Sequence, residues 1–367
     1  MSRAKISLLF TVLLVAIFVI ACGNSSGEAT PEPSVSPEAS ASPEASAEPG
    51  HSDTDLESGG LVIYSGRSES LVGPIIEQFE EETGIDVKVR YGGTAEMAAT
   101  ILEEGDRSPA DIFYAQDPSG LGAVAVQGLF QTLPTDILES VDPRFRADDG
   151  SWVGITGRVR VVVYNTERLS EDDLPTDMWG FTDPQWKGRI GWAPTNGSFQ
   201  AMVTAMRAIW GEERTREWLE GILANEPTVY ENNTSIVAGV GAGEVDVGFV
   251  NHYYLYRFLA EQGESFPARN YFLPGGGPGS IVLVSGVGIL KNAEHQEAAE
   301  QFVRFLLSEE AQSYFAEKTY EYPMNPAVKP YGDLPPLDSL NVPDVDLSNL
   351  TDLQGTIELL REVGALP

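Results

Sequence analysis

The sequence is poor in cysteine, histidine and basic residues. It has one cysteine, Cys22, so an intrachain disulfide is excluded, and a cysteine-built zinc or iron–sulfur site is excluded with it. Its three histidines, His51, His252 and His295, are too few for a histidine-rich catalytic metal centre. Lys and Arg number 23 against 55 Asp and Glu, which gives a net charge of −32. This balance argues against nucleic acid as a partner and against adsorption to an anionic membrane surface.

Motifs of common enzyme classes are also missing. The glycine-rich stretch 275–280 lacks the lysine and the spacing of a phosphate-binding P-loop. A Gly-x-Ser-x-Gly elbow followed by a usable histidine does not occur, and neither does His-Glu-x-x-His. Acidic pairs are so numerous that none can be singled out as a glycosidase pair. We therefore expect a binding protein and not an enzyme.

The N-terminus carries an export and anchoring pattern. A short basic start precedes an apolar run over 6–21, which is shorter than a comfortable membrane span and is typical of a secretory signal peptide. The run ends in Val19-Ile20-Ala21-Cys22, which resembles the lipobox of bacterial lipoproteins. We expect 1–21 to be a signal peptide and Cys22 to carry the lipid that anchors the protein to the membrane on its extracytoplasmic side. An uncleaved signal anchor is the alternative.

Residues 22–59 have the composition of a disordered tether. They contain no aromatic residue, no Lys and no Arg, and a Ser-Pro-Glu-Ala-Ser unit occurs at 36–40 and again at 42–46. Such a segment cannot bury enough apolar surface to offset its chain entropy. Its prolines and negative charges keep it extended. We expect the function to lie downstream.

From residue 61 onward, short apolar runs alternate with helical patterns. With 42% hydrophobic residues overall, this part can build a sizeable core. We predict strands at 61–64, 85–89, 111–114, 158–164, 245–250 and 280–290. We predict helices around 71–79, 95–104, 199–210, 212–224, 297–308, 310–318 and 350–363. Strands separated by helices favour parallel sheets covered by helices, in which ligands bind beyond the carboxyl ends of the strands.

The order of these elements predicts an α/β protein of two lobes. We assign 60–157 and the return segment 275–328 to lobe 1, 158–274 to lobe 2, and 329–367 to a C-terminal tail with a short helix. The segments 158–164 and 280–290 are the candidate crossovers. They would act as hinges between the lobes, and closure about such hinges encloses a ligand in many binding proteins.

Two adjacent tyrosines, Tyr253 and Tyr254, are the most informative polar feature. At the start of a helix their directions differ by roughly 100°, so both phenols can reach one point in a cleft, and Asn251 fits the N-cap position. A phenol has a pKa of about 10, so at neutral pH only a strong Lewis acid such as ferric ion displaces its proton. We expect His252 to point aside. Alternatively, the two rings pack under a lobe or stack on a ligand.

Other polar residues follow predicted strands or open a helix. The guanidinium groups of Arg67 and Arg158 are suited to gripping an anion. Asn196-Gly197-Ser198 opens a helix, where backbone N–H groups and the Ser198 hydroxyl could hold an anion. A carboxylate at Glu69 or Asp117 could complete a metal shell or bind an ammonium group. Each also has an ordinary interpretation as a surface arginine, a capped turn or a solvated carboxylate.

Six stretches of the body together resemble the ferric-ion-binding proteins of bacterial ABC importers over about 61–328. They are 62–66 (VIYSG), 107–114 (RSPADIFY), 157–164 (GRVRVVVY), 186–195 (WKGRIGWAPT), 251–254 (NHYY) and 321–326 (EYPMNP). The resemblance implies a type 2 periplasmic-binding-protein-like fold, in which each lobe is a mainly parallel sheet flanked by helices and hinge strands join the lobes. It also implies a monomer that delivers iron to an ABC transporter permease.

The resemblance further implies a transferrin-like site. Tyr253 and Tyr254 would bind ferric iron, and phosphate or carbonate would complete the shell as a synergistic anion. In phosphate-using members the anion is held at positions that match Ser198, Asn233, Asn251 and the Asn196-Gly197 turn. In other members an arginine that matches Arg67 holds a carbonate.

Ligands from the first lobe stay open. Some members carry a histidine where this sequence reads Arg67-Ser68-Glu69, and a glutamate that aligns with Gln116. Other members carry a third tyrosine near Ser198. Here Glu69 or Asp117 is the candidate replacement, or water and the anion fill the shell.

Three other functions are compatible with the sequence. The first is a binding protein whose cargo is an organic cation or a phosphorylated small molecule, such as a polyamine, thiamine or a sugar phosphate, with the two tyrosines as stacking surfaces. The second is a secreted hydrolase with a carboxylate pair. The third is a surface adhesin without a small ligand.

Overall fold

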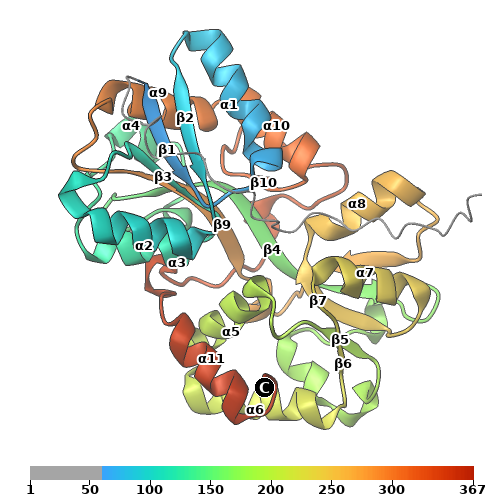
Figure 1. Ribbon diagram of the computed structural model, residues 1–367. Coiled ribbons are helices and arrows are strands. Elements are labelled where there is room, and N and C mark those ends of the chain that lie inside the picture. Colours follow the sequence, from blue (N-terminus) through green and yellow to red (C-terminus); the bar gives the residue numbers. More distant parts are fainter. Residues whose placement is uncertain (1–59) are drawn as a thin grey trace, which may run out of the picture. The chain divides into compact units, whose positions relative to one another are not determined.

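The computed structural model describes residues 60–367, so the predicted signal peptide, the tether and Cys22 lie outside the described residues. Its strands follow one another in the order β2-β1-β3-β9-β4-β7-β5-β6, and β8 and β10 also pair with β4. The strands form two groups, which we call sheet A and sheet C. Figure 1 shows β4 running between these groups.

Sheet A begins with three parallel strands in the order β2-β1-β3. The strands are β1 (Leu61–Ser65), β2 (Val87–Tyr91) and β3 (Ile112–Ala115), and the helices of this part are α1 (Glu69–Thr83), α2 (Thr94–Glu104), α3 (Pro118–Val126) and α4 (Thr135–Glu139). Every residue of β1 and β3 is buried, because helices cover the strands of a parallel sheet on both faces. The Val72, Ile75, Ile76 and Phe79 side chains form the buried face of α1.

Sheet C repeats this design with β6, β5 and β7 in parallel. Its strands are β5 (Ile190–Trp192), β6 (Thr228–Val229) and β7 (Val247–Asn251), and its helices are α5 (Gly197–Trp210), α6 (Glu212–Ala224), α7 (Asn233–Ala242) and α8 (Tyr253–Gln262). The helix α8 starts two residues after β7 ends. Side chains at that junction therefore lie at the carboxyl end of a parallel strand, as expected for a binding site in such a sheet.

The strand β4 (Val153–Asn165) belongs to both sheets, and all of its residues are buried. In sheet A it pairs antiparallel with β9 (Val282–Ile289) and β10 (Tyr322–Pro323), and in sheet C with β7 and β8 (Ala268–Tyr271). Its last partner in β9 is opposite Val159, and its first partner in β7 is opposite Arg160. The change from one sheet to the other therefore falls between two neighbouring residues.

These elements confirm the predicted α/β fold. The parallel arrangement holds within β2-β1-β3 and within β6-β5-β7, whereas every pair made by β4 is antiparallel. The second predicted crossover, 280–290, corresponds to β9, whose partners β3 and β4 are both in sheet A.

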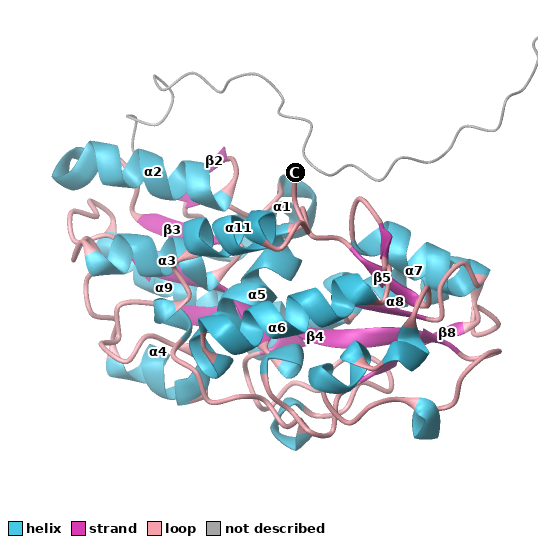
Figure 2. Ribbon diagram, turned by 90° about the horizontal axis from the view of Figure 1, so that it is seen from below, coloured by secondary structure: helices cyan, strands magenta, loops and turns pink. Residues whose placement is uncertain are grey.

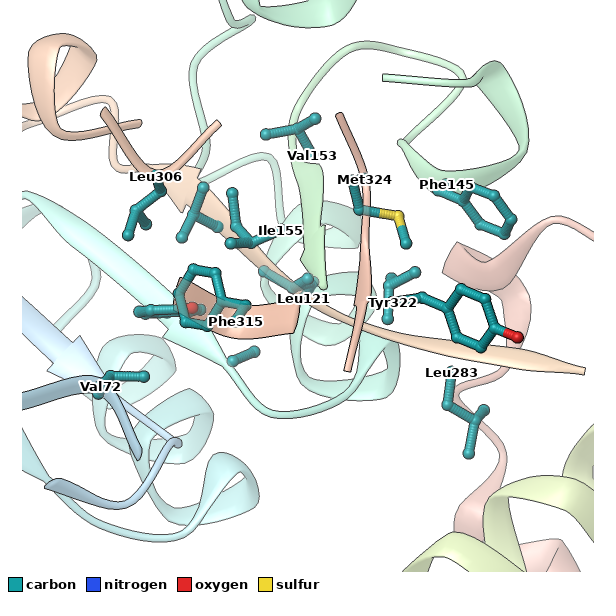
Figure 3. Packing of buried hydrophobic residues seen from close by; sticks show 14 of the residues in the cluster. Val72, Leu121, Phe145, Val153, Ile155, Leu283, Leu306, Phe315, Tyr322 and Met324 are labelled. Atoms are coloured by element: carbon teal, nitrogen blue, oxygen red, sulfur yellow. The ribbon is translucent and has the colours of Figure 1, made fainter. Parts of the chain in front are cut away.

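Two clusters of buried apolar side chains fill the protein. One surrounds sheet A, continues along α7 and the start of α8, and includes Phe315, Tyr322 and Met324 from the return segment. Figure 3 shows Phe315 and Met324 near Ile155 of β4. The other lies at sheet C and includes Trp186, Trp192 and Trp218, all fully or almost fully buried. Burying a large side chain contributes roughly 1.5–3 kcal/mol, so these clusters are the main source of stability.

The C-terminal part touches both clusters. After α9 (Gln296–Leu306), α10 (Glu309–Tyr314) and β10, Leu347 and Leu350 join the sheet A cluster beside α3. There a side chain at Gly122 would collide with the backbone oxygen of Ser348, so only glycine permits this close approach. The last helix, α11 (Leu353–Glu362), then lies against α5 (Figure 2), and its Glu362 forms an ion pair with Arg216 of α6.

Across residues 60–367, none of the helices is long and apolar enough to cross a membrane.

We expect Leu360→Ala to weaken folding more than Leu353→Ala on the same helix. Leu360 is fully buried in the sheet C cluster, whereas Leu353 is 37% exposed. Removing a buried leucine costs about 2–5 kcal/mol of unfolding free energy, and an exposed one costs about 0.5 kcal/mol. Urea unfolding measures both, and equal losses would contradict the packing of α11 described here.

Candidate functional site

The two tyrosines stand at the first turn of α8, and their rings face the same way. Ring centroids of Tyr253 and Tyr254 are 4.3 Å apart with planes 28° apart, which is a stacked pair. The side chains are 7% and 8% exposed. The guanidinium of Arg257 lies 5.1 Å from each ring centroid. Asn251, two residues before Tyr253, is hydrogen-bonded to Arg160, so the pair begins close to that arginine.

Arg160 gathers the polar side chains next to this pair. Its Nη1 donates hydrogen bonds to Ser198 Oγ at 3.1 Å, to Asn233 Oδ1 at 3.2 Å and to Asn251 Oδ1 at 3.1 Å. The Asn233 amide also donates to Asn196 Oδ1 at 3.0 Å. Four residues predicted to hold an anion, from three separate elements, thus meet around one arginine.

The starts of two helices build this cluster. Asn196 is the N-cap of α5, and its side chain accepts from the Ser198 backbone N–H at 3.1 Å. Gly197 is the exposed first residue of that helix. Asn233 is the buried first residue of α7 and accepts from the Asn251 backbone N–H at 3.2 Å.

Arg160 is only 1% exposed and has unused donors. Its Nε and Nη2 atoms are buried without a hydrogen-bond partner. Among the described residues, no carboxylate lies within ion-pair distance of it. Burial lowers the pKa of Arg160 to about 9, against the opposite effect of the two phenols, so it stays charged at pH 7. A buried charge with free donors is suited to receive an anion.

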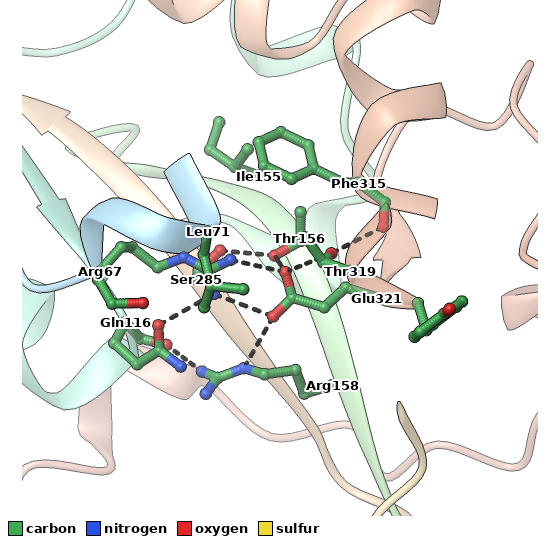
Figure 4. A network of polar contacts seen from close by, with 12 residues as sticks. Arg67, Leu71, Gln116, Ile155, Thr156, Arg158, Ser285, Phe315, Thr319 and Glu321 are labelled. Atoms are coloured by element: carbon green, nitrogen blue, oxygen red, sulfur yellow. Dashed lines mark hydrogen bonds and ion pairs between the residues drawn. The ribbon is translucent and has the colours of Figure 1, made fainter. Parts of the chain in front are cut away.

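Arg67 and Arg158 belong to a second polar network, shown in Figure 4. Arg67 is fully buried and donates from Nη1 and Nη2 to the two carboxylate oxygens of Glu321, at 2.9 and 2.7 Å. It also donates to Gln116 Oε1 at 3.0 Å. Arg158 donates to the Gln116 backbone oxygen, and its Nε lies 3.9 Å from Glu321 Oε1. The forked face of Arg67 is therefore taken by a carboxylate of the protein itself.

Glu321 is ionised in this network although it is buried. Burial alone would raise the pKa of its carboxyl group, but Arg67, Arg158 and the Thr156 hydroxyl lower that pKa to about 2. Thr156 Oγ1 donates to Glu321 Oε2 at 3.0 Å. Both carboxylate oxygens of Glu321 therefore accept hydrogen bonds, which favours burial of this ion pair, whereas the Nε atoms of Arg67 and Arg158 are buried without a partner.

The two first-lobe carboxylates predicted as metal ligands lie apart from this network. Glu69 is an exposed residue at the start of α1 and acts electrostatically on Tyr91. Asp117 is the N-cap of α3 and accepts from the Ser119 backbone N–H at 3.1 Å. Within residues 60–367, no three His, Cys, Asp or Glu side chains gather as a metal-binding group. The metal-binding role of Glu69 and Asp117 stays a prediction.

The residue before the tyrosine pair differs from the expected cap. Asn251 ends β7, and the residue at the N-cap of α8 is His252, so the interpretation of Asn251 as the cap is wrong. Asn251 instead uses its side-chain oxygen for Arg160. His252 is fully buried, and burial lowers its pKa to about 4, so its imidazole is neutral at pH 7.

A cavity of about 630 Å³ adjoins α8 but does not include the pair. Its walls are formed by β4, α8, β8 and the tail, with Tyr256, Arg269 and Asp333 among the lining residues. This cavity is therefore separate from the candidate site at Tyr253 and Tyr254.

One strand that passes between two α/β sheets, each built on parallel strands, is the arrangement expected of a two-lobed solute-binding protein. The chain belongs to the bacterial extracellular solute-binding protein family, which matches residues 74–336. Membership confirms the expected binding protein outside the cytoplasm and supports the prediction that the chain is not an enzyme.

Relatives and solved structures are similar over most of the chain. The Fe(3+)-binding periplasmic protein of Serratia marcescens is 34% identical over 84% of this chain and 91% of its own length. Iron-bound HitA from Pseudomonas aeruginosa has a TM-score of 0.75 and 37% identity, covering 83% of this chain and 99% of HitA. Trichodesmium IdiA (FutA), solved with iron and citrate, has a TM-score of 0.74 and 28% identity over 83% of this chain and 99% of its own. These findings confirm the resemblance to ferric-binding proteins.

Sequence reasoning missed Arg160 and Glu321. Arg160 had a signal in the sequence: residues two apart in a strand face the same side, so the pattern that made Arg158 a candidate fits Arg160 as well. Glu321 had no comparable signal, because its partner Arg67 lies 254 positions away in the sequence.

We expect Glu321→Gln to lower the free energy of unfolding by about 3 kcal/mol at pH 7, since it leaves buried arginines without their carboxylate. The folded-state pKa of Glu321 is about 2, below its ordinary 4.5. Its stabilising effect is therefore complete above pH 4.5 and is lost as the pH falls through 2. Urea unfolding of both proteins between about pH 7 and pH 3 measures this.

The matched control is Glu264→Gln, because Glu264 pairs with Arg269 at 3.0 Å but is 84% exposed. An exposed pair contributes about 0–1 kcal/mol. A difference between wild type and Glu321→Gln that stays constant as the pH falls would contradict the assignment of Glu321 as the buried anion.

Proposed function

We propose that this protein captures ferric iron together with a small anion outside the cytoplasm and delivers it to the permease of an ABC importer. Tyr253 and Tyr254 are the proposed iron ligands from the second lobe. The observation that carries the proposal is the stacked pair beside Arg160, whose buried donors are free. The Serratia marcescens relative and HitA, named for ferric iron, support the choice of cargo.

Phenolate oxygens are hard donors that suit a trivalent cation. Both phenols lose their protons on binding, so affinity should fall as the pH is lowered. The guanidinium of Arg257 lies 5.1 Å from each ring centroid, so a positive charge stands next to the pair. The site thus offers negative oxygens to iron while balancing part of their charge.

The proposed anion, phosphate or carbonate, binds at Arg160. Its free Nε and Nη2 donors, with Ser198 and Asn233 beside them, are the groups available for its oxygens. Arg67 is less suited to this role, because Glu321 occupies its fork. Arg158 stands beside the same carboxylate.

For the first lobe we favour Asp117 over Glu69 as a metal ligand. Asp117 follows Gln116, which contacts both Arg67 and Arg158, whereas Glu69 lies near Tyr91. The Asp117 carboxylate would exchange a hydrogen bond from Ser119 for the metal. Water or the anion would fill the remaining positions.

Anchoring by a lipid on Cys22 and action as a monomer complete the proposal. The tether 22–59 would let the binding domain move between the medium and the permease while it stays attached to the membrane. Two lipid chains would hold it there without any membrane-spanning helix.

A phosphorylated small molecule is the second candidate cargo. The free donors of Arg160 favour a phosphate group whether or not iron is present. The positive charge of Arg160 next to the rings disfavours an organic cation such as a polyamine or thiamine. Calorimetry with a sugar phosphate in the absence of iron tests this candidate.

We expect the protein to develop a visible phenolate-to-iron absorption band when it is titrated with ferric citrate in phosphate buffer. Tyr254→Phe should lose most of this band and bind iron at least tenfold more weakly, because one deprotonatable oxygen is gone. Tyr256→Phe is the control from the same helix, since its hydroxyl donates to Asp333 at 3.0 Å and lies in the separate cavity. A wild type without a band would refute iron binding by these tyrosines.

We expect Arg160→Gln to abolish the dependence of iron affinity on phosphate. In wild type, added phosphate should strengthen iron binding about tenfold or more, in keeping with a charge-assisted contact of roughly 1.5–3 kcal/mol. Equilibrium competition with citrate at several phosphate concentrations measures the effect. Arg269→Gln, which removes an exposed pair, should behave as wild type, and equal phosphate dependence in all three proteins would rule out Arg160 as the anion site.

A further inference from the structure

His252 lies beside the candidate site and contacts both the tyrosine pair and the return segment. It is the residue between β7 and α8, directly before Tyr253, and its side chain is fully buried. Its ring packs at 4.8 Å from the ring centroid of Tyr322 and at 5.8 Å from that of Tyr253. A histidine here is therefore in contact with both the tyrosine pair and the return segment of the first lobe.

Every polar group of His252 is hydrogen-bonded. Its backbone N–H donates to the Val159 oxygen at 3.0 Å, and its backbone oxygen accepts from Asn270 Nδ2 at 2.8 Å. Its Nδ1 accepts from the Val159 N–H at 3.1 Å, and its Nε2 lies 2.8 Å from the Tyr320 oxygen. Because Nδ1 accepts, the ring proton is on Nε2 and is donated to Tyr320. A side chain held at both nitrogens has one tautomer and one orientation.

The bond to Val159 extends the strand pairing beyond the end of β7. Val159 is the residue of β4 at which the strand changes from sheet A to sheet C. At that position the imidazole nitrogen takes the place of a backbone oxygen from β7. The start of α8 is thereby fixed to β4, which also carries Arg160.

The bond to Tyr320 reaches the first lobe's return segment at a strained residue. Tyr320 ends the π-helical turn Phe315–Thr319 with φ at +60°, which is uncommon for a residue other than glycine. The next residue is Glu321, which binds the fork of Arg67. His252 therefore connects the backbone of the tyrosine pair to the turn that aims Glu321.

We infer that His252 is a positioning residue for the tyrosine pair: its imidazole, bonded to Val159 and to Tyr320, sets how the two phenols stand relative to β4 and to the Glu321 network. This inference rests on the proposed iron site. Residues behind a metal ligand that fix its orientation change metal affinity by about 10–100-fold when they are replaced.

Two substitutions separate the two bonds. His252→Asn places an oxygen near the position of Nδ1, so it keeps an acceptor for Val159 and loses the donor to Tyr320. His252→Gln reaches toward Tyr320 with an amide donor and loses the acceptor next to Val159. His295→Asn is the matched control, because His295 is a half-exposed histidine whose Nδ1 lies 3.0 Å from Asp111 Oδ2 in the first lobe.

The experiment titrates the full chain with ferric citrate in phosphate buffer and records the absorption band and the affinity. We expect both His252 variants to shift the band maximum and to weaken iron binding by about tenfold or more, while His295→Asn leaves both unchanged. Thermal unfolding without iron, recorded in parallel, shows whether each variant is folded. A folded variant with a shifted band demonstrates positioning, since loss of stability alone does not move the band of the bound fraction.

The outcomes separate this inference from the proposed function. If wild type gives the band and both folded His252 variants match it in position and affinity, the positioning role is refuted while the iron site stands. If wild type gives no band, the iron site is refuted and this inference fails with it. If only His252→Asn shifts the band, the bond to Tyr320 carries the effect; if only His252→Gln does, the bond to Val159 carries it.

Discussion

A buried guanidinium needs acceptors and a counter-charge, and this requirement shapes the junction between the two sheets. Arg67 and Arg158 have their counter-charge in Glu321, although the Nε atom of each is buried without a hydrogen-bond partner. Arg160 has hydrogen-bond acceptors only for Nη1, and these are uncharged oxygens. Its Nε and Nη2 atoms have no hydrogen-bond partner. The unbalanced positive charge lies close to the start of α8, which carries the tyrosine pair. Under the proposed function, the bound iron and anion would complete the electrostatic balance of the site.

The strand β4 brings the two networks together by its pleat. Thr156, Arg158 and Arg160 alternate along it, so their side chains leave the same side of the strand. Thr156 and Arg158 contact Glu321, while Arg160 contacts Ser198, Asn233 and Asn251. A strand buried along its whole length cannot shift its register without moving all these groups at once. The spacing between the networks is therefore set by the residue spacing of a single strand.

Most of the fold was predictable because it depends on local periodicity. The apolar runs predicted β1, β3 and β7, and amphipathic spacing predicted α1, α9 and α10, since each pattern matches the period of its element. The role predicted for the paired phenols at the start of α8 depended instead on the resemblance to ferric-binding proteins. The Arg67–Glu321 pair and the cluster around Arg160 were not predictable, because each depends on residues that only tertiary folding brings together. The N-cap of α8 was predicted wrongly as Asn251. The residue at that position is His252, whose ring contacts Val159 and Tyr320 and does not cap its own helix.

The tail that ends in α11 has a mechanical consequence. Its residues dock first on α3, where Gly122 lets the backbone come close, and then on α5 and α6. The two halves of the molecule are thus linked by β4, by the chain between β8 and β9, and by this outer segment. A rotation of one half must therefore deform the outer segment as well as the two central connections. Substitutions in the outer segment are a way to change the resistance to this rotation without altering the buried strand.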